Sequence, residues 1–157
     1  MQVLLRSSVL GALATIFCAA VTASGAKVVT VAILPARAIP GETNADRWND
    51  FCTGLLREDC SLIRGIRVVD QSSVDFALDD MKLKVSEGLS AAEAARVGKA
   101  VEADWVLSWS YQKSGNRWKV EAVAVGVTRP PAKRFAKSAI GWKAIEPELL
   151  AYFLAVS

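Results

Sequence analysis

The chain has 157 residues, of which 52% are hydrophobic, and it carries a formal net charge of +3 without a single histidine. The absence of histidine excludes Ser-His-Asp and Cys-His nucleophile systems and most zinc sites. A net charge this small, with basic residues dispersed along the chain, does not favour nucleic acid or an anionic membrane surface as a partner.

Residues 1–26 have the pattern of a secretory signal peptide. A single positive charge at Arg6 precedes an apolar run over residues 9–21, and small side chains follow this run. The run is short for a membrane-spanning helix. Cleavage after Ala23 or Ala26 fits the pattern, and a retained amino-terminal anchor is the alternative. We therefore expect a periplasmic or secreted protein with no stable membrane span after cleavage.

The remainder, residues 27–157, is expected to form a single domain. A chain of this size buries roughly two-thirds of its unfolded surface around one core. Cys18 suggests a lipoprotein, but Phe17 precedes it where a lipoprotein signal carries a small residue. We therefore predict that the signal has no lipobox.

The first elements of the mature chain are a buried strand and an amphipathic helix. The β-branched, nearly all-apolar run over residues 28–34 predicts a central strand that stops at Pro35. Asn44 or Asp46 can cap a helix that continues to about Asp59. One apolar stripe of this helix predicts a core face, formed by Trp48, Phe51, Cys52, Leu55 and Leu56.

Cys52 and Cys60 would be exported to a compartment in which disulfides persist. In one continuous helix their Cα atoms would lie about 12 Å apart, which is too far for a bridge. A disulfide requires the helix to end before Cys60. The acidic pair Glu58 and Asp59 favours an early end, because negative charge opposes the helix dipole there. Two buried free thiols are the alternative.

The next segment predicts a short strand and two helices. Residues 66–69 form the strand, and Ser72 or Ser73 caps the first helix. Ser90 and Glu93 have the spacing of a capping box, which predicts the start of the second helix. Small side chains on one side of that helix would allow a close approach to a sheet: Ala91, Ala94, Ala95 and Gly98.

The last third of the chain predicts three strands and a closing helix. Large and small side chains alternate over residues 105–111, a turn follows at residues 114–116, and residues 117–127 return as an antiparallel strand. Residues 133–140 predict an edge strand. Residues 146–156 predict a helix that buries Leu149, Leu150, Phe153 and Leu154.

The order β-α-β-α-α-β-β-β-α predicts an α/β (α+β) fold. Right-handed crossovers between the first strands and hairpins at the end give a single mixed sheet of about five strands. We expect the helices chiefly on one face of this sheet.

Four aromatic residues near the predicted hairpin are candidates for partner binding. Three project from one face of the first strand and one follows just after the turn: Trp105, Trp109, Tyr111 and Trp118. Burial against helices is the favoured interpretation. An exposed platform that contacts a protein or glycan is the alternative.

The polar residues indicate no catalytic, metal or cofactor site. Neighbouring acids such as Asp79 and Asp80 point about 100° apart on a helix, so they do not converge on a substrate. Asp70 is interpreted as a turn or cap residue. No phosphate-binding glycine motif is present. The densest basic group is interpreted as the wet face and rim of the hairpin, with single-stranded nucleic acid as the alternative: Arg117, Lys119, Arg129, Lys133, Arg134 and Lys137.

Four segments keep the order and spacing of a known family pattern. They are Val31-Ala32-Ile33-Leu34-Pro35, Arg67-Val68-Val69-Asp70, residues 74–80 and Ala103-Asp104-Trp105-Val106-Leu107. Together they resemble the α/β domain of the TolB amino-terminal region and of the curli-secretion and LpoB-type penicillin-binding-protein-activator lipoproteins. Two positions depart from the pattern, since Ala36 stands where the family often has Phe and Trp109 where it usually has glycine.

This resemblance implies a domain of the bacterial cell envelope, with no catalytic residues and no cofactor to carry over. We expect a non-enzymatic binding or accessory domain that acts through contacts with an envelope protein. The alternative is a homo-oligomeric subunit of a secretion or surface-fibre assembly related to the curli channel family. A small enzyme that uses carboxylates is the least favoured hypothesis.

Overall fold

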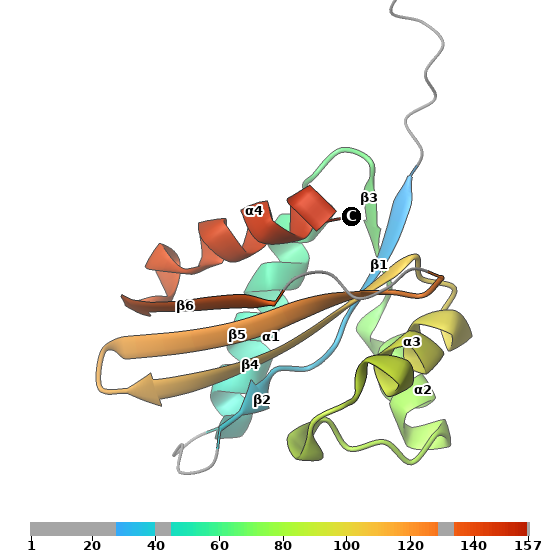
Figure 1. Cartoon of the computed structure of the whole chain (residues 1–157), viewed down its shortest axis with the longest axis horizontal. Helices are drawn as coiled ribbons and strands as arrows, with labels where there is room; N and C mark the ends of the chain where they lie inside the picture. Colours follow the sequence, from blue (N-terminus) through green and yellow to red (C-terminus); the bar gives the residue numbers. More distant parts are fainter. Residues whose placement is uncertain (1–27, 40–44, 129–133, 157) are drawn as a thin grey trace, which may run out of the picture.

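The computed structural model describes residues 28–39, 45–128 and 134–156. These residues form one mixed sheet in the order β3-β1-β4-β5-β6, with a short strand β2 paired to β4 (Figure 1). The strands are β1 (Val29–Ile33), β2 (Arg37–Ala38), β3 (Ile66–Val68), β4 (Trp105–Ser114), β5 (Arg117–Gly126) and β6 (Phe135–Ile140). The helices are α1 (Ala45–Ser61), α2 (Gln71–Asp80), α3 (Ala91–Ala100) and α4 (Glu146–Val156), with 3₁₀ turns η1 (Val85–Glu87) and η2 (Trp142–Ala144).

The predicted α/β fold with a single mixed sheet is confirmed, and β2 is the strand that the sequence did not reveal. The predicted signal peptide lies outside the described residues. Among the described helices, none has the length and apolar character needed to cross a membrane.

The helices cover both faces of the sheet, whereas the sequence predicted them chiefly on one face. Helices α1 and α4 enclose a core with Ile33 and Leu107, and α2 and α3 enclose a second core with Ala32 and Val106. Figure 1 shows α4 above the hairpin strands and α2 and α3 below them.

The strand order explains this arrangement. Strands β3 and β4 both lie parallel to β1, on opposite sides of it. The connection through α1 therefore runs one way across the sheet, and the connection through α2 and α3 runs back the other way. Because such crossovers are right-handed, the two connections place their helices on opposite faces.

Helix α1 continues through Ser61, so the predicted early end before Cys60 is wrong. Cys52 and Cys60 are both buried and both free. The disulfide considered from the sequence is not formed, because one continuous helix holds the two thiols too far apart. Burial raises the pKa of Cys52 to about 12 and that of Cys60 to about 11, which makes both thiols unreactive. Phe51 at the margin of the apolar stripe is 51% exposed, contrary to the predicted core role.

The starts of α2 and α3 are fixed by side-chain caps. Asp70, and not Ser72 or Ser73, caps α2 by accepting a hydrogen bond of 3.3 Å from the backbone nitrogen of Ser72. The predicted capping box of Ser90 and Glu93 is confirmed at α3. Both caps satisfy amide groups that lack partners inside the helix.

Helix α3 lies unusually close to the sheet at Gly98. A Cβ atom built there would lie 2.4 Å from Val106 Cγ2 and 2.6 Å from Val127 Cγ2. The close approach predicted from the small side chains of α3 is therefore present at this glycine.

Strands β4 and β5 form the predicted antiparallel hairpin, in register from Trp105 opposite Gly126 to Ser114 opposite Arg117. Strand β6 pairs with β5 alone and forms the predicted edge of the sheet. In α4, Leu149 is fully buried, but Leu154 is 45% exposed, so its predicted burial is wrong.

Candidate protein-binding face

The structure buries all four sequence-predicted aromatic residues in one core, where Tyr111 has ring contacts with both Trp109 and Trp118. The exposed fractions are 6% for Trp105, 3% for Trp109, 0% for Tyr111 and 4% for Trp118. Trp142 of η2 completes the cluster, with ring centroids 5.6 Å from Trp109 and 5.9 Å from Trp118. These rings form the core beneath α1 and α4, and they do not present an exposed platform.

Trp109 makes a hydrogen bond that the sequence did not indicate. Its indole nitrogen Nε1 donates a hydrogen bond of 3.0 Å to the carbonyl oxygen of Leu34, just after β1. The tryptophan therefore fills the core and satisfies a buried backbone acceptor.

The opposite face of the same strands is polar and partly uncovered. We call it the open face. Its polar strand residues are Ser108, Ser110, Gln112, Ser114, Arg117, Lys119, Glu121 and Ser138, and its apolar ones are Val123, Ala136 and Ile140, of which Ile140 is 70% exposed. The hairpin extends past α3 (Figure 1), and Gln112, Lys119 and Ser138 are exposed to solvent. The alternation that buries the aromatic rings therefore directs a polar row to the other side of the sheet.

A cleft of about 150 Å³ lies where the open face meets η1 and β2. Its polar lining includes Arg37, Ser110, Glu121 and Arg134. Arg37 is placed by the pairing of β2 with β4, which sets it opposite Ser110. Its guanidinium lies against Gly88, where a Cβ atom would come within 2.8 Å of Nη1. Because Gly88 has no side chain, the guanidinium of Arg37 can occupy this position beside the cleft.

The charges around the cleft are unbalanced. Glu121 is 3.0 Å from Lys119 Nζ and 3.8 Å from Arg134 Nη1. The hydrogen bond and charge of Lys119 hold the pKa of Glu121 below its usual range, and Arg134 and Arg37 contribute to the lowering. Arg117 adds another exposed cation. Among the described residues of the open face and the cleft lining, four are cations (Arg37, Arg117, Lys119 and Arg134) and one is a carboxylate (Glu121), a balance of +3.

Sequence reasoning missed Arg37. It lies between two prolines in a segment without periodicity, and β2 has only two residues, so no local signal marked it. Arg117, Lys119 and Arg134 belong to the basic group that was interpreted as the face and rim of the hairpin, and their positions agree with that interpretation. Lys137 lies elsewhere, in an ion pair of 2.9 Å with Glu148 of α4.

A second polar cluster contains Arg67 and Asp104, which belong to two of the four segments that carry the sequence resemblance. The backbone nitrogen of Thr30 donates to Asp104 Oδ2 at 2.8 Å, and the backbone nitrogen of Asp104 donates to the Thr30 carbonyl at 2.7 Å. Arg67 donates to Thr30 Oγ1 at 3.0 Å. These bonds join the starts of β1 and β4 with β3, which gives Asp104 a structural role.

Two acidic residues from different helices, Glu146 of α4 and Asp59 of α1, lie next to each other. Burial raises the pKa of Glu146 in α4; the hydrogen bond from Trp142 Nε1 lowers it, and the adjacent Asp59 carboxylate of α1 raises it. Glu58, Asp79 and Asp80 are exposed. Within the described ranges, no group of three or more His, Cys, Asp or Glu side chains is placed to hold a metal ion.

No protein-family model matches this sequence, and comparison with curated proteins gives no match. Solved structures with a similar fold do exist. The LpoB C-terminal domain from Salmonella enterica is similar with a TM-score of 0.56 and 17% identity, over 73% of this chain and 84% of that chain. For the LpoB C-terminal domain from Escherichia coli the TM-score is 0.52 and the identity 15%, over 76% and 88% of the two chains.

Lipoprotein GNA1162 from Neisseria meningitidis has the same type of fold, with a TM-score of 0.54 and 14% identity over 82% of this chain and 92% of that chain. At this level of identity the similarities establish the fold. The fold implied by the LpoB part of the sequence resemblance is therefore supported by the structure, whereas the TolB and curli parts remain predictions.

Proposed function

We propose that this chain is a non-enzymatic accessory domain of the bacterial cell envelope that acts by binding another protein. The observation that carries the proposal is the open face, an exposed polar sheet surface with unbalanced positive charge, on a fold similar to the LpoB C-terminal domain. We further propose that residues 1–26 direct the chain to the periplasm.

No observation above favours the alternative of a secretion or surface-fibre subunit related to the curli channel family. The same holds for a homo-oligomer. The candidate function therefore rests on a contact between this domain and a different protein.

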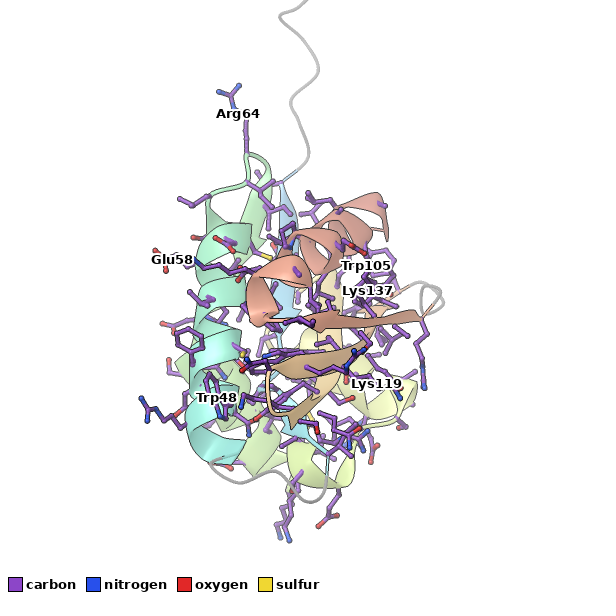
Figure 2. All side chains as sticks on the ribbon, turned by 90° about the vertical axis from the view of Figure 1, so that its left-hand side faces the viewer. Trp48, Glu58, Arg64, Trp105, Lys119 and Lys137 are labelled. Atoms are coloured by element: carbon purple, nitrogen blue, oxygen red, sulfur yellow. The ribbon has the colours of Figure 1, made fainter. Side chains whose placement is uncertain are left out.

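Site-directed photo-crosslinking in intact cells tests the proposal. A photoreactive amino acid is placed at Gln112 or Ser138, which are exposed on the open face, and at Glu58 or Asp79, which are exposed on α1 and α2. Figure 2 shows Glu58 on the outer side of α1, away from Lys119. We expect one crosslinked protein from both open-face positions and none from the two control positions.

Two results would contradict the proposal. One is the absence of any crosslink from the open face in cells that produce and export the chain. The other is an equal pattern of crosslinks from all four positions, which would indicate random collision.

A further inference from the structure

We infer that the open face binds an acidic segment of its partner protein, with one carboxylate of that segment held between Arg37 and Arg134 at the cleft. This inference rests on the proposed protein-binding function and specifies the chemistry of the partner. Charge complementarity identifies the occupant, because the described residues of the open face and the cleft lining include four cations and one carboxylate.

Arg37 is the main binding group. It is half-buried, and no described Asp or Glu lies within 4.0 Å of it to form an ion pair. Its backbone is fixed by pairing with β4, and its guanidinium rests on Gly88. A guanidinium held in this way is suited to bidentate binding of a carboxylate, since little freedom remains to be lost on binding.

Arg134 supplies the second cation from the other side of the cleft. Its contact with Glu121 is long, at 3.8 Å, and its side chain is 73% exposed. Lys119 is closer to Glu121, at 3.0 Å. Because Lys119 already neutralises Glu121, Arg134 can turn to an incoming carboxylate at small cost.

The rest of the lining favours a protein segment over a lipid surface or a nucleic acid. The cleft is small and concave, with Ser108 and Ser110 beside the aliphatic side chains of Leu89 and Val123. Such a mixed lining fits a peptide, which carries both carboxylates and apolar groups. A flat anionic membrane cannot reach into a cleft, and a face with four cations offers few contacts to the evenly spaced phosphates of a nucleic acid.

The test measures binding of a short oligomer of L-glutamate to the full chain by fluorescence anisotropy, with an oligomer of L-glutamine as the uncharged probe. The variant Arg37→Gln/Arg134→Gln removes the two binding cations. The matched control, Arg47→Gln/Arg64→Gln, removes the same charge from exposed positions elsewhere. Figure 2 shows Arg64 projecting from the end of the molecule remote from Lys119.

We expect the wild type to bind the glutamate oligomer and not the glutamine oligomer. Loss of the two arginines should weaken binding about tenfold or more, the effect of losing at least one hydrogen bond to a charged group. The control variant should keep its affinity within about twofold, because Arg47 and Arg64 are exposed positions outside the cleft lining. Equal thermal unfolding curves would show that all variants are folded.

Three outcomes overturn the inference. Equal weakening in the control variant would show that net charge alone attracts the oligomer. Binding to anionic phospholipid vesicles, without binding to the oligomer, would assign the face to a membrane. No binding of the oligomer, together with a specific crosslink from Gln112, would reject the acidic partner while leaving the proposed protein-binding function in place. Oligomer binding without any crosslink in cells would instead count against the proposed function.

Discussion

Trp109 joins two parts of the core, since its ring packs against Trp142 and its indole nitrogen bonds to the carbonyl of Leu34. The side chain is 3% exposed. A residue that combines buried aromatic area with a satisfied backbone acceptor is costly to remove, because both the cavity and the unpaired carbonyl remain.

We predict that Trp109→Gly lowers the free energy of unfolding by about 3 to 5 kcal/mol. Urea denaturation followed by circular dichroism measures the change. Phe51→Ala is the control, since this aromatic side chain is 51% exposed and its removal should cost less than about 1 kcal/mol. A loss of similar size in the two variants would show that Trp109 is not a core residue.

At the scale of elements, the sequence revealed the strands and helices better than their arrangement. The alternation over residues 105–111 and the capping box at Ser90 are local patterns, and the structure has the corresponding strand and helix. The face covered by each helix depends on strand order, which no local pattern encodes. The cleft shares this difficulty, because Arg37 and Ser110 are far apart in the sequence and meet only through the β2–β4 pairing.

The close contact between α3 and the sheet depends on the absence of a Cβ atom at Gly98. We predict that Gly98→Ala destabilises the fold by about 1 to 3 kcal/mol, because the new methyl group would overlap two valines whose rotamers are restricted. Thermal unfolding measures the shift in melting temperature.

A matched control exists in α1. Gly54 has no atom within 4 Å of an added Cβ, so Gly54→Ala should stabilise the protein by up to about 1 kcal/mol through helix propensity. Because Val106→Ala removes one of the overlapping methyl groups, the double variant Gly98→Ala/Val106→Ala should lose less stability than the sum of the two single losses. If Gly98→Ala is as stable as Gly54→Ala, the close approach of α3 to the sheet is not as described.

For the molecule as a whole, stability depends on pH because folding lowers the pKa of some carboxyl groups and raises that of another. Hydrogen bonds from Ser90 lower the pKa of Glu93, and Lys119 lowers that of Glu121, so both groups favour folding when they are ionised. Burial raises the pKa of Glu146, and the folded chain therefore holds a proton there more strongly than the unfolded chain does.

The raised pKa of Glu146 makes the folded state more stable at low pH than at high pH. This contribution is fully present below the unfolded pKa of this carboxyl and is lost as the pH rises through its raised folded value. We predict that Glu146→Gln makes the protein more stable than the wild type at neutral pH, by less than about 1 kcal/mol because the group is partly exposed. The difference should shrink as the pH falls below about 4.

Urea denaturation of both proteins across this pH range measures the difference. Subtracting the wild-type curve removes the contributions of Glu93 and Glu121, which are common to both proteins. A difference that stays constant with pH would show that Glu146 is not perturbed by burial.

The β4–β5 hairpin serves two purposes with alternate residues of the same strands. Trp109, Tyr111 and Trp118 belong to the interior, while Ser110 and Glu121 line the cleft on the other face and Lys119 is exposed beside Glu121. Substitutions at the outward positions can therefore retune recognition during evolution while the interior stays intact. An insertion or deletion of one residue within the hairpin would exchange the two sets, so this segment can diversify by substitution but not by change of length.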